Sequence, residues 1–280
     1  RNFSLIKPLK IMKKAVFFLT IILAFNTVNA QITTTKVAEK KEEISTTPYD
    51  SLQNFLAEDV RKYIGQDLYL KGKSESLRKF GYSKFLLNYQ YKGSEKDKNI
   101  YKCCDSYSSK YDALNGKYFN VVSVIKHPKA AENKYLYGAK FYLELNEKES
   151  GDKVYFEYNA SFKSSFPFIV VGFFEKAKST VVGQKFVFNN RVLKSSTDIN
   201  TGDSLVNTPN QKWECTDLTI EEKYYSLSLI IKNSVGQSTD ISYSSVFGIH
   251  RQGKAYTEKE ANLYEQKFGK SSWLTILNRE

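Results

Sequence analysis

A short internal repeat constrains the fold of this chain more than any other feature. Ile64–Leu70 and Val182–Phe188 share one pattern: a hydrophobic residue, Gly, Gln, any residue and then three strand-forming residues. Two further matches follow in the same order, Tyr101–Cys103 with Trp213–Cys215, and KYFNVVSVI (117–125) with KYYSLSLII (223–231). Because self-similarity along a sequence is typical of repeated modules, these matches predict a duplicated structural unit.

The residues within each unit predict short antiparallel strands. Segments rich in aromatic and β-branched residues alternate with Gly-, Asn- and Lys-rich breaks, and they cover 67–70, 117–125, 139–145 and 153–159. The break 146–153 (NEKESGDK) is typical of a hairpin connection. The 20 Tyr and 19 Phe residues favour half-buried sheet surfaces. We expect a mainly β protein: two small antiparallel barrels in tandem, preceded by a short helix and followed by a C-terminal helix.

Helical spacing appears at both ends of this region. Asp50 or Ser51 can cap a helix over 51–62, whose apolar residues recur every three or four positions. Thr257 can cap a second helix that ends at Gly269, and 271–280 then begins another strand.

The most apolar segment after the leader is FPFIVVGFFEK (166–176). We interpret it as a strand that is buried on both faces, or as the seam where the two barrels pack. Both interpretations are favoured over a hairpin that touches a membrane.

The N-terminal region has the three parts of a Sec-type signal peptide. Met12 is the single Met; two lysines follow it, then the apolar run Ala15–Phe25 and a polar exit that ends at Ala30. The apolar run is shorter than the roughly 20 residues of a membrane-spanning helix. We therefore expect translation to start at Met12, residues 1–11 to lie upstream, and cleavage after Ala30 to release an exported protein, periplasmic or extracellular, without a transmembrane span.

These patterns divide the chain into five parts. They are a signal peptide over 12–30, a flexible linker over 31–49, a helix with the first β-barrel unit over 50–160, the second unit over 161–250, and a C-terminal helix over 251–280. The last part also contains the start of a further segment, which leaves open whether the polypeptide continues.

The leader ends in Asn29-Ala30-Gln31 within a chain rich in Lys, Asn, Ile and Tyr. In these respects the chain resembles uncharacterised exported proteins of the Bacteroidetes. Its repeated units resemble bacterial SH3-like modules in the size and order of their strands. The resemblance covers the leader, the compositional style and the strand architecture; it carries no motif, so it transfers no binding residues.

Signatures of catalysis and metal binding are missing from the sequence. The two histidines, His127 and His250, have no second histidine or cysteine at metal-ligand spacing. There is no G-x-S-x-G elbow, phosphate loop or dinucleotide fingerprint. We therefore assign no catalytic, cofactor-binding or metal-binding residue, expect no cofactor, and expect that the protein is not an enzyme.

The three cysteines, Cys103, Cys104 and Cys215, leave one unpaired. One hypothesis joins Cys103 or Cys104 to Cys215 and so ties the two units together. The alternative places Cys103 and Cys215 at equivalent core positions of two barrels, too far apart to bond. From the repeat we predict that Cys215 is a free, buried thiol.

Charge gives the only indication of a partner. Without residues 1–30 the chain has 37 basic and 30 acidic residues, a net charge of +7, which favours anionic partners. Basic and aromatic residues interleave over 68–93, either as a stacking platform or as a strand with its rings in the core.

We expect an exported, non-enzymatic binding or interaction module of the cell envelope or the extracellular space. Its partner would be a protein or an anionic envelope or glycan polymer, and nothing points to a specific nucleic acid. A structural or assembly factor of the envelope is the alternative, and a hydrolase acting on cell-wall or glycan polymer ranks third. The sequence leaves the oligomeric state open.

Overall fold

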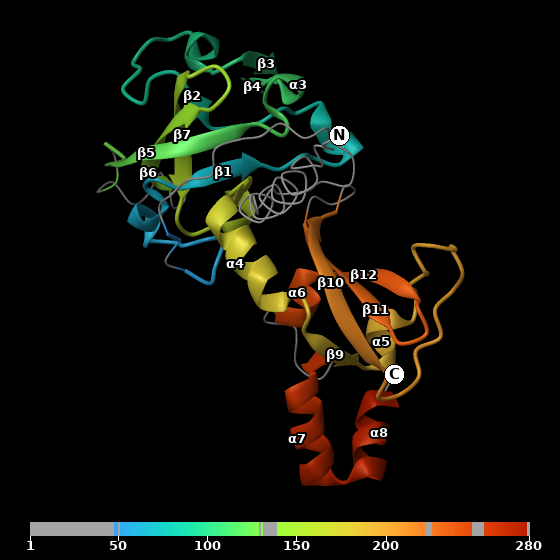
Figure 1. Ribbon diagram of the computed structural model, residues 1–280. Coiled ribbons are helices and arrows are strands. Elements are labelled where there is room, and N and C mark those ends of the chain that lie inside the picture. Colours follow the sequence, from blue (N-terminus) through green and yellow to red (C-terminus); the bar gives the residue numbers. More distant parts are fainter. Residues whose placement is uncertain are drawn as a thin grey trace, which may run out of the picture. The chain divides into compact units, whose positions relative to one another are not determined.

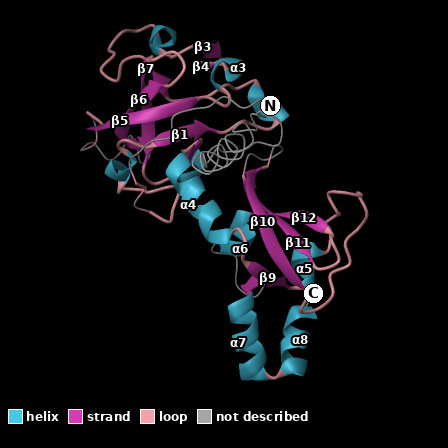
Figure 2. Cartoon of the chain, in the orientation of Figure 1, coloured by secondary structure: helices cyan, strands magenta, loops and turns pink. Residues whose placement is uncertain are grey.

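The computed structural model describes residues 48, 49, 51–128, 130, 139–221, 226–247 and 255–278. Within these residues the protein is mainly β, as predicted: thirteen strands form antiparallel sheets of six, five and two strands (Figures 1 and 2). The predicted signal peptide, most of the predicted linker and His250 lie outside the described residues. No helix within the described residues has the length and hydrophobicity needed to cross a membrane.

The first sheet contains all four strands predicted in the first unit. Its strand order is β2 (Phe85–Leu86), β7 (Lys153–Asn159), β6 (Ala139–Glu147), β5 (Tyr118–Lys126), β1 (Asp67–Leu70) and β8 (Phe168–Val170). Burial alternates along β7, where Val154, Phe156 and Tyr158 are buried and the residues between them are partly exposed. β1 and β8 are buried along their whole length, which explains why both are continuous runs of large side chains.

The second sheet repeats this order with one strand fewer. Its strands are β12 (Ser238–Ser242), β11 (Leu227–Asn233), β10 (Lys212–Ile220), β9 (Lys185–Phe188) and β13 (Ala255–Thr257). Thus β9 to β13 correspond in turn to β1, β5, β6, β7 and β8, and each sheet contains a three-strand meander with two further strands at one side.

Hydrogen bonds show that the two glycines of the repeat are equivalent, as predicted. The Gly65 N–H donates to the Val121 carbonyl at 2.8 Å, and the Gly183 N–H donates to the Cys215 carbonyl at 2.8 Å. Both glycines have left-handed backbones, with φ of +79° and +81°, which glycine adopts without strain. β5 and β10 each have a register shift directly after the residue that accepts this bond. The two units therefore share strand order, register and a bulge.

The other two matches of the proposed repeat are wrong. Cys215 takes the position of Val121, and the segment 117–125 corresponds to 211–219 rather than to 223–231. Cys103 belongs to a segment between β1 and β5 that is much longer in the first unit than in the second. The two short matches were assigned in their order along the chain. Because the first unit has the longer segment, residues paired in this way do not occupy equivalent positions.

An α-helix of eleven residues follows the last strand of each sheet. α4 (Val171–Val181) follows β8, and α7 (Glu258–Phe268) follows β13. Lys178 of α4 forms an ion pair with Asp217 of β10 at 2.7 Å, while Gly172 lies against Tyr49 and Gln66 of the first unit. The apolar segment 166–176 is thus a strand only over Phe168–Val170; its remainder is a helix that contacts both units.

The N-terminal helix prediction is wrong over most of its length. Only Val60–Tyr63 is helical, as the 3₁₀ helix η1. The side chain of Asn54 explains this, because it accepts from the Val170 N–H at 2.8 Å and donates to the Phe168 carbonyl at 2.9 Å. Asn54 therefore satisfies backbone groups of β8. These bonds hold the segment in a non-helical conformation, although its apolar residues have helical spacing.

The C-terminal region agrees with one prediction and corrects another. α7 begins at a capping box formed by Thr257 and Glu260 and ends at Gly269, as predicted. The segment after it is the helix α8 (Lys270–Asn278) rather than a strand. Trp273 and Leu277, four residues apart, are its buried positions, and the Trp273 indole N–H donates to Asn210 at 3.1 Å.

The SH3-like barrels are not confirmed. Over the described residues both large sheets are open, with β2 and β8 at the edges of the first and β12 and β13 at the edges of the second. The predicted boundary after residue 160 falls before β8, which pairs with β1 and so belongs to the first sheet.

Candidate functional site

The largest difference between the two units is the connection from their first strand to their second. In the first unit this connection is residues 71–117, which we call the insertion; in the second unit it is 189–211. The insertion contains α2 (Glu75–Arg78), β2, η2 (Lys96–Asn99), β3 (Cys103–Asp105), β4 (Ser108–Ser109) and α3 (Tyr111–Leu114) (Figure 1). Long connections on a rigid scaffold commonly carry function, which makes the insertion the candidate functional site.

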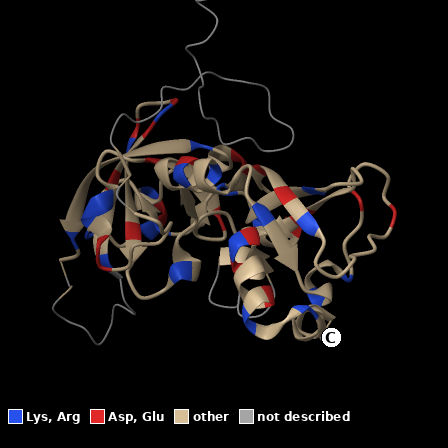
Figure 3. Ribbon diagram, turned by 60° about the horizontal axis from the view of Figure 1, so that its bottom comes forward, with Lys and Arg blue, Asp and Glu red and all other residues tan. Residues whose placement is uncertain are grey.

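The insertion holds most of the excess positive charge of the chain. It has eleven basic and five acidic residues, a net charge of +6, against +7 for the chain from Gln31 onward. The equivalent connection 189–211 has two of each. Over the described ribbon as a whole, Lys and Arg are interspersed with Asp and Glu (Figure 3). Positive charge is therefore concentrated in the insertion.

Large apolar side chains of the insertion are exposed beside these cations. They are Leu77, Phe80, Leu87, Tyr91 and Tyr107, and Tyr107 is 83% exposed. The ammonium of Lys79 lies 5.1 Å from the ring centre of Phe80. Three further cations of the insertion, Lys73, Arg78 and Lys102, lie over tyrosine rings. Basic and aromatic groups are thus adjacent in space as well as in sequence.

The segment 68–93 does not form one alternating strand. Tyr82 and Phe85 are buried in the core, while Phe80, Leu87 and Tyr91 are exposed. The core interpretation therefore holds for the rings of Tyr82 and Phe85, and the exposed rings of Phe80 and Tyr91 are available for stacking.

Buried tyrosines hold successive loops of the insertion against one another. The Tyr82 hydroxyl donates to the Lys71 carbonyl at 2.7 Å, and its ring stacks on Tyr111 with centres 5.6 Å apart. Gly81 makes a close approach possible, since a Cβ at this position would lie 2.0 Å from the Ser109 carbonyl oxygen. The exposed groups consequently project from an anchored loop.

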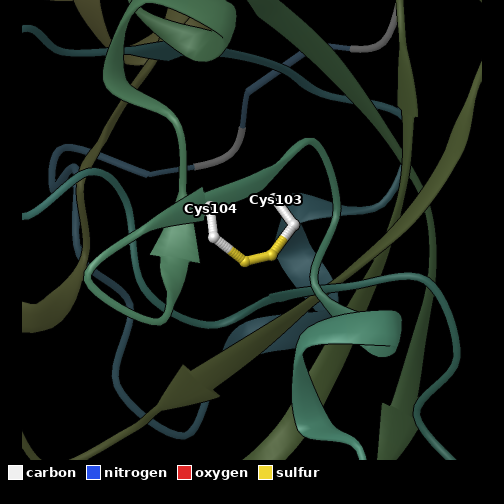
Figure 4. The surroundings of a disulfide bond; sticks show 2 residues. All are labelled: Cys103 and Cys104. Atoms are coloured by element: carbon white, nitrogen blue, oxygen red, sulfur yellow. A yellow bond between two sulfur atoms is a disulfide. The ribbon is translucent and has the colours of Figure 1, made fainter.

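Cys103 and Cys104 of β3 are joined to each other by a disulfide (Figure 4). Both are half-buried, and Cys215 is free and buried, which confirms the prediction for that residue. Burial raises the pKa of the Cys215 thiol to about 11. The predicted equivalence of Cys103 and Cys215 is wrong, and a bond between neighbouring cysteines was not foreseen.

The segment next to the disulfide is anchored by a buried ion pair. Glu147, at the end of β6, is 0% exposed and accepts from Lys102 at 3.0 Å, from the Ser150 hydroxyl at 2.6 Å and from the Glu149 N–H at 3.1 Å. Burial opposes ionisation of Glu147, but these hydrogen bonds outweigh it and hold the pKa of the carboxyl below its usual value. The Tyr101 hydroxyl donates to Asp152 at 2.8 Å in the same hairpin.

Backbone strain is concentrated around the two cysteines. Lys102, Ser106 and Tyr107 have φ of +47°, +44° and +63°, in the left-handed region that residues other than glycine rarely adopt. Such strain persists where the surrounding structure enforces it, and it is common at functional sites. Here Asp105 contributes by accepting from the Tyr111 N–H at 2.8 Å.

One group of potential metal ligands occurs among the described residues. It consists of Asp97, Cys103 and Cys104, whose ligand atoms lie within 4.8 Å of one another. The sequence did not predict this group, because the usual metal-ligand patterns contain histidines or spaced cysteines. Two adjacent cysteines six residues after an aspartate were the available signal.

His127 directly follows β5 and is buried, and its ring stacks on Tyr142 of β6 with centres 4.8 Å apart. This stacking gives His127 a packing role. His250 lies outside the described residues.

No protein family, curated protein or solved structure matches this chain.

Proposed function

We propose that this protein is an exported, non-enzymatic binding module of the cell envelope or the extracellular space. Its ligand would be an anionic polysaccharide, bound by the insertion of the first unit. The observation that supports this most directly is the net charge of +6 on the insertion, compared with zero on the equivalent connection of the second unit.

The chemistry of the insertion suits a charged glycan. Lysine ammonium groups attract carboxylate or phosphate groups along a polymer, and exposed tyrosine and phenylalanine rings stack on the apolar faces of sugar rings. Lys79 with Phe80 is one such pair. The exposed groups lie on several successive loops, an arrangement that favours a long polymer over a small molecule.

Export and the finer fold assignment belong to the same proposal. The leader Met12–Ala30 supports export, and N-terminal sequencing of protein from its native host tests cleavage before Gln31. Each repeat has five equivalent strands, β1 and β5 to β8 in the first unit and β9 to β13 in the second, and this strand number supports a relation to SH3-like modules.

A binding experiment tests the ligand class. The chain from Gln31 onward is titrated with a soluble acidic polysaccharide and with a neutral one at low ionic strength. We expect binding of the acidic polymer alone, weakening as salt is raised, because salt screens exposed charges. Equal binding of both polymers, or of neither, would refute the proposal.

A charge-matched pair of variants tests the location. The first replaces exposed Lys92, Lys96 and Lys110 of the insertion by Gln; the control replaces exposed Lys232, Lys259 and Lys270 of the second unit by Gln. At about 0.5 kcal/mol for each exposed charge, the first variant should bind about tenfold more weakly. An equal loss in the control would show that net charge, and not the insertion, determines binding.

A further inference from the structure

The vicinal cysteines and Asp97 form a compact set of ligand atoms. Asp97 belongs to η2, whereas Cys103 and Cys104 belong to β3, and their carboxylate oxygen and sulfur atoms lie within 4.8 Å of one another. Asp97 is exposed and the two cysteines are half-buried, so solvent reaches the group.

The neighbouring lysines do not neutralise this carboxylate. Lys98 forms an ion pair with Glu95 at 2.8 Å, and Lys102 forms one with Glu147 at 3.0 Å. Both ammonium groups therefore have other acidic partners, and the Asp97 carboxylate has no ion pair with another described residue.

We propose that Cys103, Cys104 and Asp97 form a redox-controlled site for a thiophilic divalent cation such as Zn²⁺. In the disulfide form the two sulfurs are bonded to each other and cannot act as thiolates. An external dithiol reductant would transfer two electrons and two protons, break the S–S bond, give two thiols and become a disulfide itself. The cation would then displace both thiol protons and bind two thiolates and the Asp97 carboxylate.

The ligand types and spacing agree with this chemistry. Zinc in proteins binds thiolate sulfur at about 2.3 Å and carboxylate oxygen at about 2.0 to 2.2 Å, with tetrahedral geometry. Two thiolates on one zinc therefore lie about 3.8 Å apart, so the sulfurs must separate after reduction. The three protein ligands leave the fourth position to water. This inference does not rest on glycan binding.

Metal titration of the two redox forms tests the proposal. The full chain from Gln31 onward is reduced under anaerobic conditions and titrated calorimetrically with Zn²⁺, and in parallel with Cd²⁺ while thiolate-to-metal absorption is recorded. We expect one ion per reduced chain, absorption typical of cadmium thiolate, and no such site in the oxidised chain. Equal binding by oxidised and reduced protein would overturn the proposal.

Two variants assign the ligands, and two further variants serve as controls. The double variant Cys103→Ser/Cys104→Ser should lose the site, and Asp97→Asn should weaken binding by at least tenfold while keeping the thiolate absorption. Asp112→Asn, an exposed acid elsewhere in the insertion, and Cys215→Ala should bind as the unmodified chain does. Because Asp97 is exposed, its substitution leaves the fold intact, and wild-type affinity in Asp97→Asn would refute the three-ligand site.

Discussion

Replacing Lys102 by Met removes the positive charge from an ion pair whose carboxylate, that of Glu147, is fully buried. Glu147 is 0% exposed and would keep its bonds from Ser150 and from the Glu149 N–H, but it would lose its charged partner at 3.0 Å. Breaking a fully buried ion pair typically costs about 3 to 5 kcal/mol. Since the Lys102 side chain is 29% exposed, water can replace part of the interaction. We therefore expect a loss of about 2 to 3 kcal/mol in the free energy of unfolding.

The assay is urea unfolding of the oxidised chain, followed by far-ultraviolet circular dichroism. Tryptophan fluorescence is less suitable because both tryptophans, Trp213 and Trp273, belong to the second unit. The matched control is Lys98→Met: the Lys98–Glu95 pair has a similar distance of 2.8 Å, but its side chains are 69% and 65% exposed. That control should cost less than about 0.5 kcal/mol. A cost for Lys102→Met as small as for Lys98→Met would refute the reasoning.

The difference between wild type and Lys102→Met should also depend on pH. The pKa of Glu147 is lower in the folded protein than in the unfolded chain, so its ionised form stabilises the fold above the ordinary carboxyl pKa. This contribution is lost as the pH falls through the lowered value. Unfolding measured at neutral pH and again in acid should therefore show the two proteins converging in acid. A constant difference would mean that Glu147 is not the group responsible.

Two further predictions concern the second unit. Cys215→Val should change the free energy of unfolding by less than about 0.5 kcal/mol, because the equivalent Val121 is fully buried, whereas Cys215→Ala should cost about 1 to 2 kcal/mol through lost packing; urea unfolding compares them, and a costlier Val variant would contradict the equivalence. Thr257→Ala should cost about 1 kcal/mol by removing the capping box of α7, measured by thermal unfolding, with exposed Thr275→Ala in α8 as the milder control.

Strands were the most predictable elements because the alternation of apolar and polar residues along a strand indicates which side chains are buried. Along β7 the alternation of Val154, Phe156 and Tyr158 with more exposed residues is visible in the sequence and recurs in the structure. Gly65 and Gly183 were recognisable because a left-handed residue before a strand strongly favours glycine. Sequence patterns were sufficient for elements whose conformation depends on neighbouring residues in the chain.

Predictions failed where a distant partner determines the local structure. Asn54 hydrogen bonds to β8, 114 and 116 residues away, and the segment around it is therefore not helical. The segment 271–278 contains β-favouring residues, yet Trp273 is buried against Tyr256 of β13, with ring centres 4.9 Å apart, and the chain is helical there. Tertiary packing overrode intrinsic propensity in both segments.

The candidate site was only partly visible in the sequence. The basic and aromatic character of 68–93 pointed to the correct region, but which rings are exposed depends on the anchoring of Tyr82 against Tyr111 and Ser109. The disulfide between Cys103 and Cys104 was obscured because the repeat was extended to include Cys103. Once Cys215 is assigned to the position equivalent to Val121, no counterpart of Cys103 remains in the second unit.

The comparison of the two units therefore indicates where this protein differs from a purely structural repeat. β10 and β5 share register and bulge, and Asn233 takes the position of Glu147, where its side-chain oxygen likewise accepts from a hairpin N–H, that of Val235, at 3.2 Å. The scaffold was thus kept in both units, with a charged residue in one and a neutral amide in the other. Glu147 requires its charge because Lys102, which has no counterpart in the second unit, comes from the insertion. In the first unit the hairpin thus holds the segment that carries the two bonded cysteines, and the Lys102–Glu147 ion pair at 3.0 Å couples the scaffold to the insertion.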